Sequence, residues 1–223
     1  MTTGAQILSI YQALLSAFGH RRWWPADTAE EVVIGAILAQ NVAWENAHKA
    51  IEALNQQRLL SLPAIHQTDT ADLAPLIRSS RFFNQKAERL KNFAILLFDQ
   101  FDGDLTALFS LDLATARKSL LNLKGFGPET VDSILLYAAG KPIFVIDAYT
   151  RRIFERLKMT ASDWSYQSYQ DFFMSRLPRD PALFNDYHAQ IVYLGNQICK
   201  KKRPLCARCP LENQCSGPME SLP

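Results

Sequence analysis

The sequence reads LNLKGFGPET over residues 121–130, a pattern that predicts two helices joined by a tight turn. Gly125 and Gly127 permit positive φ and close approach of the backbone to a partner, and Pro128 suits the first turn of the second helix. The start of that helix offers free N–H groups and a positive dipole end, which suit a phosphate group. A G-x-G turn between helices is more often an ordinary connection, so its function depends on what surrounds it.

A second motif follows, IFVIDAYTRR over residues 143–152. Its apolar segment delivers one carboxylate, that of Asp147, to the start of a predicted helix. An isolated Asp at this position is most often an N-cap that accepts a backbone hydrogen bond. A helix N-terminus also favours an ionised carboxylate, which can stabilise developing positive charge or orient a nucleophile. The sequence allows both roles.

The third motif is a cysteine segment that contains all four cysteines of the chain, Cys199, Cys206, Cys209 and Cys215. Four thiolates from one short segment can surround a tetrahedral zinc ion or the corners of a [4Fe-4S] cluster. A zinc ribbon usually has two Cys-x2-Cys pairs, whereas only the middle pair is close here. The spacing therefore favours the cluster, whose simplest role is to fasten the end of the chain.

Composition limits the class of protein. The chain has 223 residues, 48% of them hydrophobic, and 24 basic against 22 acidic side chains, so its net charge of +2 predicts no particular partner. A local cluster of cations, Lys200 to Arg203, directly follows Cys199. Such a run is often a solvated face, but on a loop held by a metal cluster it could bind phosphates.

Hydrophobic periodicity indicates an all-α fold. Apolar residues recur at helical spacing nearly everywhere, and no series of alternating strands is visible. Thr28 followed by Glu31 predicts a capping box at the start of a buried helix. No segment approaches the roughly 20 continuous apolar residues of a membrane span, and the first residues lack the pattern of a signal peptide. We therefore expect an intracellular, cytoplasmic protein with no membrane partner.

The three motifs, in this order, resemble the helix-hairpin-helix DNA glycosylases of the endonuclease III type. The resemblance implies a two-lobed all-α fold, with a helical-barrel domain at 24–139 that ends in the hairpin and an iron–sulfur domain formed by 1–23 plus 140–223. It implies that Asp147 is catalytic and that the four cysteines hold a [4Fe-4S] cluster. It also implies a monovalent cation at the hairpin carbonyls.

One departure from that family concerns strand cleavage. Bifunctional members place a nucleophilic lysine two residues after the second glycine of the hairpin, where this chain has Glu129. A carboxylate cannot form a Schiff base, so we expect a monofunctional enzyme that uses water. Lys124 and Lys141 lie nearby in the sequence and stay open as substitutes for the lysine.

Further segments, WWP at 23–25, GAILAQNVAW at 35–44 and GPETVDSI at 127–134, resemble the endonuclease III-related 3-methyladenine glycosylases. In these relatives the pair equivalent to Gln40 and Asn41 lies at the DNA face, and the glutamine helps fill the gap left by the flipped nucleotide. Alkylation makes a purine cationic, which favours stacking on tryptophan. Trp23 and Trp24 are the candidates, although one of them is expected in the core.

The expected partner is double-stranded DNA that contains a damaged base, bound by a monomer. Phosphate contacts are expected from the hairpin amides at Gly125 and Gly127 and from a basic face at Arg151, Arg152, Lys200, Lys201, Lys202 and Arg203. Glu129 is expected at the DNA or substrate site as well. The alternatives are a bifunctional glycosylase/AP lyase for oxidised pyrimidines and a DNA-binding paralogue without catalysis. An adenine glycosylase is less favoured, because the chain ends after the cysteine segment.

Overall fold

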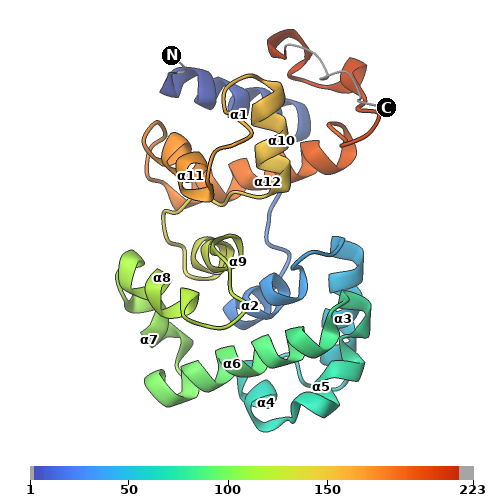
Figure 1. The fold of residues 1–223 in the computed structure, drawn as a ribbon, viewed down its shortest axis with the longest axis vertical. Coiled ribbons are helices and arrows are strands. Elements are labelled where there is room, and N and C mark those ends of the chain that lie inside the picture. Colours follow the sequence, from blue (N-terminus) through green and yellow to red (C-terminus); the bar gives the residue numbers. More distant parts are fainter. Residues whose placement is uncertain (1–2, 216–223) are drawn as a thin grey trace. The chain divides into compact units, whose positions relative to one another are not determined.

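The computed structural model describes residues 3–215, and this part of the chain is helical with no β-strand. The α-helices are α1 (Gly4–Phe18), α2 (Ala29–Leu38), α3 (Trp44–Gln56), α4 (Leu62–Gln67), α5 (Thr70–Leu76), α6 (Phe83–Phe101), α7 (Leu105–Ser110), α8 (Leu113–Leu121), α9 (Pro128–Ser133), α10 (Ala148–Arg156), α11 (Tyr166–Met174) and α12 (Pro181–Gln197). Short helical segments are η1 (Arg78–Ser80), η2 (Ile134–Ala138), η3 (Cys206–Arg208) and η4 (Glu212–Gln214). The all-α prediction is confirmed (Figure 1).

The chain divides into two compact units. One runs from Trp24 to Lys141, and the other joins the segment that ends at Trp23 to the segment that begins at Pro142. The ends of the predicted domains, residues 1–2 and 216–223, lie outside the described residues. The prediction that the second unit binds an iron–sulfur cluster stays a prediction.

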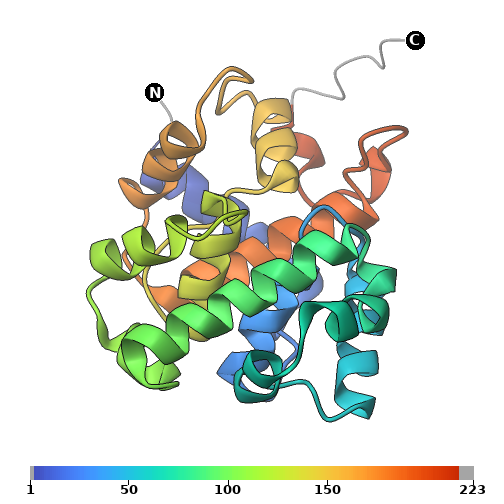
Figure 2. The ribbon, with the colours of Figure 1, turned by 60° about the horizontal axis from the view of Figure 1, so that its bottom comes forward.

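Helix α2 is the centre of the unit from Trp24 to Lys141. Every residue from Val32 to Leu38 is buried, and α2 packs against α3, α6, α9 and η2. The long helix α6 packs against α2, α4, α5 and α7 (Figure 2). A helix buried on all sides fits the apolar run that the sequence shows at this place.

The predicted capping box of α2 is half formed. Thr28 is the N-cap, and its Oγ1 accepts a hydrogen bond from the Glu31 N–H at 3.2 Å. The Glu31 carboxylate instead accepts from the N–H of Asp27 at 3.0 Å, one residue before the position that a capping box requires. Both side chains still accept hydrogen bonds from backbone N–H groups at the start of the helix.

The hairpin joins α8 to α9 as predicted from its turn residues. Gly125 has φ +86°, a value that side chains rarely allow. Gly127, in contrast, is the extended N-cap of α9 with φ −87°, so only the first glycine of the turn uses a positive φ. A Cβ atom at Gly127 would meet nothing within 4 Å, which leaves this stretch of backbone accessible.

A buried ion pair fastens the two hairpin helices together. Arg117 on α8 donates from Nε and Nη2 to the two carboxylate oxygens of Asp132 on α9, at 2.7 and 3.1 Å. The Asp132 side chain is 0% exposed and that of Arg117 is 22% exposed. Since removal of one partner leaves the other charge buried, the pair is expected to control the stability of the hairpin.

We expect Arg117→Met to lower the free energy of unfolding by about 3 kcal/mol, because it leaves the Asp132 carboxylate buried without its bidentate partner. Urea denaturation followed by circular dichroism measures this change. Lys118→Met is the matched control, because Lys118 is the next residue of α8 and is exposed. Equal stability of the two variants would contradict the prediction.

In the other unit, α12 packs against both α1 and α10. The buried Tyr187 of α12 donates its hydroxyl to the carbonyl of Ile7 on α1 at 2.8 Å. Asp186 accepts hydrogen bonds from the Arg21 N–H and from the Tyr11 hydroxyl. These contacts tie the first segment of the chain to α12.

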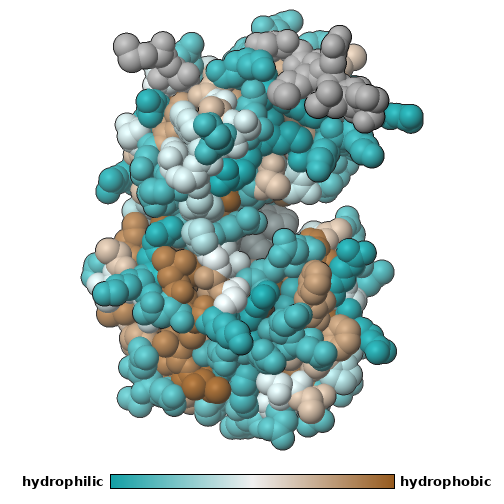
Figure 3. Space-filling view, viewed as in Figure 1, coloured by the Kyte–Doolittle hydropathy of each residue, from teal (hydrophilic) through white to brown (hydrophobic). Residues whose placement is uncertain are grey.

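Figure 3 shows a mostly hydrophilic face, with apolar side chains gathered over α7 and α8. Among residues 3–215, no helix is both long enough and apolar enough to cross a membrane.

Candidate active site

Asp147 is placed by the buried segment Ile143–Ile146 at the N-cap of α10. Its Oδ1 accepts hydrogen bonds from the N–H and the Oγ1 hydroxyl of Thr150, at 2.7 and 2.8 Å. The residue is 8% exposed. The carboxylate is therefore fixed through one oxygen, and its charge lies at the positive end of the helix dipole.

The second oxygen of Asp147, Oδ2, lies 3.7 Å from Nε2 of His188 on α12. Burial lowers the pKa of His188 below its ordinary value, although the charge of Asp147 acts in the opposite direction. The imidazole is therefore neutral at pH 7, and this contact is not an ion pair. The carboxylate keeps its negative charge available to a substrate.

His188 was not predicted from the sequence. It is one of four histidines and lies on an apolar face of α12, where a satisfied core histidine is the ordinary expectation. Its nearness to Asp147 depends on the packing of α10 against α12, and no local pattern encodes that packing.

Gln40 is bound to the hairpin. Its Nε2 donates to Thr130 Oγ1 at 2.8 Å and to the Gly125 carbonyl at 3.3 Å. Its Oε1 accepts from Nη1 of Arg89, on α6, at 2.5 Å. The neighbouring Asn41 is exposed, with φ +53°. The monovalent cation expected at the hairpin carbonyls stays a prediction.

The position that the resemblance assigns to a nucleophilic lysine is exposed. Glu129 lies there, in the first turn of α9. Of the two lysines considered as substitutes, Lys141 donates from Nζ to the carbonyl of Leu111 at 2.7 Å. Lys124 is exposed in the turn before Gly125.

The two candidate tryptophans belong to different units. Trp24 packs edge-on against Trp44, with ring centroids 5.2 Å apart, and its ring lies 5.4 Å from that of Tyr137. The close approach of Trp24 to α2 depends on Gly35, where a Cβ atom would lie 3.0 Å from the indole nitrogen. Trp23 is half-buried and belongs to the unit that also contains Asp147.

The predicted basic face is only partly exposed. Arg151 donates to the Trp164 carbonyl at 2.9 Å and lies over the ring of Tyr169. Arg152 donates to the carbonyls of Gly195 and Cys199, at 2.8 and 3.0 Å. The four cations from Lys200 to Arg203 are all exposed.

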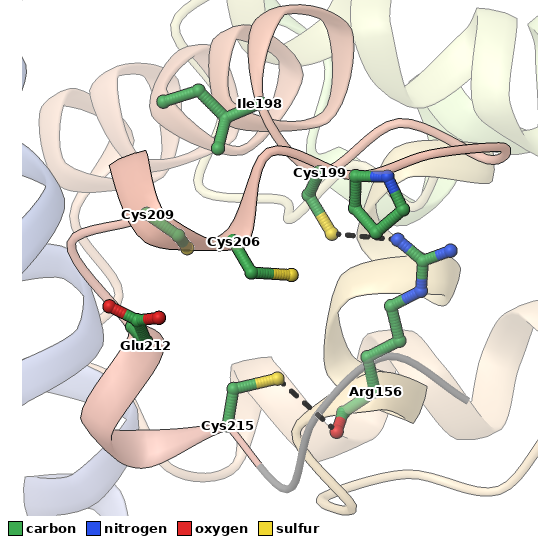
Figure 4. Close-up of a pocket in the computed structure, with 8 residues that line it drawn as sticks. Arg156, Ile198, Cys199, Cys206, Cys209, Glu212 and Cys215 are labelled. Atoms are coloured by element: carbon green, nitrogen blue, oxygen red, sulfur yellow. Dashed lines mark hydrogen bonds between the residues drawn. The ribbon is translucent and has the colours of Figure 1, made fainter. Parts of the chain in front are cut away.

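The four cysteines line one cavity, whose empty space is about 620 Å³ and is partly open to solvent. Figure 4 shows the side chains of all four directed into this space. Arg156 of α10 donates from Nη1 to the sulfur of Cys199 at 3.1 Å, and the thiol of Cys215 faces the Arg156 carbonyl at 3.7 Å. Burial raises the pKa of the Cys209 thiol, and the other three cysteines add to this effect.

Two kinds of metal site make different demands on the cysteine sulfurs. Within residues 3–215, no three Cys, His, Asp or Glu side chains are grouped closely enough to hold a metal ion. A single zinc ion requires four sulfurs at about 2.3 Å from one point. Sulfurs spread around a cavity instead fit a group with several metal atoms.

Two features at the start of α6 were not predicted from the sequence. Phe82, directly before α6, is 59% exposed with φ +44°, and Arg81 has φ +57°. Both are backbone conformations that residues with side chains seldom adopt. Lys86, one turn into α6, is 0% exposed. In the sequence, these residues look like the start of an ordinary amphipathic helix.

The chain is similar to known protein families and solved structures. Residues 34–179 match the family described as the HhH-GPD superfamily of base excision DNA repair proteins. The chain belongs to the HhH-GPD superfamily. It is a base-excision repair DNA glycosylase of that superfamily, and the predicted resemblance to endonuclease III is confirmed.

Three relatives of this HhH-GPD glycosylase illustrate the match. A protein of Methanocaldococcus jannaschii, whose name assigns it provisionally to the DNA repair glycosylases, is 41% identical and covers 94% of this chain and 95% of its own length. The H. pylori 3-methyladenine DNA glycosylase, solved with 1,N6-ethenoadenine, is 26% identical with a TM-score of 0.76, over 88% of this chain and 98% of that one. A non-covalent endonuclease III–DNA complex has a TM-score of 0.83 at 21% identity, over 97% of this chain and 96% of that one, which shows a shared fold.

Proposed function

We propose that this glycosylase hydrolyses the glycosidic bond of an alkylated purine, such as 3-methyladenine, in duplex DNA without cutting the strand. The observation that carries the proposal is the setting of Asp147. Thr150 holds one carboxylate oxygen, and the second faces a neutral imidazole. A fixed, uncompensated negative charge can stabilise oxocarbenium character at C1′ and can orient the attacking water.

The hairpin supports hydrolysis over lyase chemistry. Glu129 occupies the position of the lysine, and a carboxylate cannot form a Schiff base with the deoxyribose. Lys141 is held by the Leu111 carbonyl, so an attack would cost that hydrogen bond. The exposed Lys124 favours the second candidate function, a bifunctional glycosylase/AP lyase.

The aromatic group around Trp24 supports an alkylated purine as substrate. Methylation at N3 or N7 gives the base a positive charge, which an indole face attracts. Trp24, Trp44 and Tyr137 form an aromatic group beside Gly35, and Trp23 is a further candidate. The similarity to the H. pylori 3-methyladenine glycosylase points to the same substrate class. An alkylated base is also a good leaving group, so one carboxylate suffices for catalysis without a general acid that protonates the base.

In this proposal, backbone amides and cationic side chains of the protein bind the phosphates of duplex DNA, and other side chains enter the base stack. The accessible amides around Gly127 suit a phosphate, and the exposed run from Lys200 to Arg203 suits others. Phe82 presents an exposed aromatic ring on strained backbone, which fits insertion between bases. Gln40, held by Arg89 and Thr130, would fill space left by the flipped nucleotide.

We further propose that the four cysteines hold a [4Fe-4S] cluster, since their sulfurs surround one cavity without forming a site for a single ion. Bound iron would favour the thiolates and thereby offset the burial that raises the Cys209 pKa. The cluster would supply rigidity to the loop from Lys200 to Arg203. Arg156 contacts both Cys199 and the carbonyls of Lys200 and Lys201, so it would hold the loop against α10.

A panel of lesions tests the proposed activity. We expect release of 3-methyladenine and 7-methylguanine, and little release of thymine glycol, uracil, hypoxanthine or adenine opposite 8-oxoguanine. The abasic product should keep an intact strand until alkali is added. Excision of thymine glycol alone, together with strand scission, would contradict both the alkylpurine and the monofunctional proposals.

Borohydride trapping tests the lyase alternative separately. We expect no covalent enzyme–DNA adduct, because Glu129 stands at the position of the family's nucleophilic lysine. An adduct that disappeared in Lys124→Ala or Lys141→Ala would establish the bifunctional alternative. Glu129→Lys is the informative gain-of-function control, since it restores the family's lysine on an exposed position of α9.

A further inference from the structure

Lys86 on α6 is a completely buried cation that links two loops. Its Nζ donates to the carbonyl of Leu38 at 2.8 Å and to the carbonyl of Ser80 at 2.5 Å. Leu38 is the last residue of α2, and Ser80 is the last residue of η1. One ammonium group therefore joins the ends of two segments that are far apart in the sequence.

Each of these carbonyls directly precedes a strained loop. After Leu38 the chain turns through Gln40 to Asn41, which has φ +53°. After Ser80 it passes through Arg81 and Phe82, at φ +57° and +44°. Such conformations cost free energy and persist where the surrounding structure fixes them, typically at functional sites.

The lysine occupies a costly position. Burial, together with the charge of Arg89, lowers the pKa of Lys86 to about 8, so the ammonium is only moderately favoured at neutral pH. A buried polar group is tolerated when its hydrogen bonds are satisfied. An apolar side chain of the same length would fill this space without that cost, so the ammonium is best explained by the two carbonyls that it holds.

We propose that Lys86 is a positioning residue that sets the separation between the Gln40 loop (residues 39–43) and the Phe82 loop (residues 81–82). This inference rests on the proposed function, in which both loops meet the DNA at the flipped nucleotide. Arg89, one turn later on α6, acts in the same direction because it holds the amide of Gln40. Two side chains of helix α6 thus hold both loops in place.

The same helix provides a matched control. Lys91 on α6 also donates from Nζ to two backbone carbonyls, those of His66 and Thr68. It holds the connection between α4 and α5, which the proposed function does not use. Lys86→Met and Lys91→Met therefore each remove two hydrogen bonds to backbone carbonyls from one helix, although Lys91 is less buried. Only Lys86 contacts the loops in question.

The test uses duplex DNA with an abasic-site analogue and 2-aminopurine opposite it, whose fluorescence rises when the base is unstacked. We expect wild type and Lys91→Met to raise the fluorescence on binding, and Lys86→Met to bind with similar affinity but without this rise. Single-turnover excision of 3-methyladenine by Lys86→Met should fall by about 10- to 100-fold, as expected for a displacement of about 1 Å. If Lys86→Met does not fold, Lys86→Gln replaces it with the same expected direction.

A double-mutant cycle with Phe82→Ala shows whether Lys86 acts through the loop. In the Phe82→Ala background, Lys86→Met should change the fluorescence little further, because coupled residues are not additive. Fully additive effects, identical behaviour of Lys86→Met and Lys91→Met, or a wild type that leaves the fluorescence unchanged would each overturn the inference. If wild type excised no lesion while the fluorescence differences persisted, the proposed activity would be wrong and the positioning role would stand.

Discussion

Asp147→Asn is expected to lower the single-turnover rate of base excision by about 10²- to 10⁴-fold, because it removes the negative charge without removing the side chain. Asparagine is as good an N-cap as aspartate. Its Oδ1 can still accept the hydrogen bonds from Thr150, so α10 should begin at the same residue. Stability and affinity for abasic-site DNA should therefore change little, and the loss should appear in the chemical step.

The control for this variant is Asp180→Asn, since Asp180 is the N-cap of α12 in the same unit and accepts from the Ala182 N–H at 2.9 Å. We expect it to excise bases at the wild-type rate. If Asp147→Asn retained full activity, Asp147 would not be catalytic. If wild type and Asp147→Asn were equally inert on every lesion yet both bound abasic DNA, the chain would be the non-catalytic paralogue.

Cys206→Ser is expected to abolish iron and sulfide binding and the visible absorption of the protein, because three thiolates remain where the cluster uses four. The loop from Lys200 to Arg203 should then lose its support. The slope of log K against log salt for DNA binding should fall by about 1 for each phosphate that the loop no longer neutralises. Metal analysis and a salt titration measure the two effects.

Ala207→Ser is the control for the cysteine variant, because it places the same side chain at an exposed, neighbouring position of η3. It should keep both the iron and the salt dependence of wild type. Colourless wild-type protein with one zinc ion per chain would refute the cluster. Full iron content in Cys206→Ser would show that this cysteine is not a ligand.

Local patterns were sufficient for the helical fold and for the position of Asp147. The apolar run that becomes α2, the turn at Gly125 and the N-cap of α10 depend on residues that are neighbours in the sequence. The sequence could not distinguish the positive φ of Gly125 from the negative φ of Gly127, because glycine permits both. Gly127 is an extended N-cap, and the absence of a side chain there leaves the backbone accessible.

Long-range packing explains what the sequence did not reveal. His188 lies 41 positions after Asp147 and meets it only because α12 packs on α10. The bonds from Gln40 to the hairpin span 85 and 90 positions, and those of Lys86 to Leu38 span 48. Arg151 and Arg152, which the sequence analysis assigns to a basic face, also donate to carbonyls within the chain.

Asp147 is the N-cap of helix α10, and Arg156 is its last residue. Arg156 donates hydrogen bonds to Cys199, Lys200 and Lys201 of the cysteine loop. A nine-residue helix is a stiff rod about 14 Å long, so a tilt of about 5° moves one end relative to the other by about 1 Å. A movement of the cysteine loop that tilts α10 would therefore also move the Asp147 carboxylate. We therefore expect oxidative damage to the loop to displace the Asp147 carboxylate, although the loop itself has no proposed role in the chemical step.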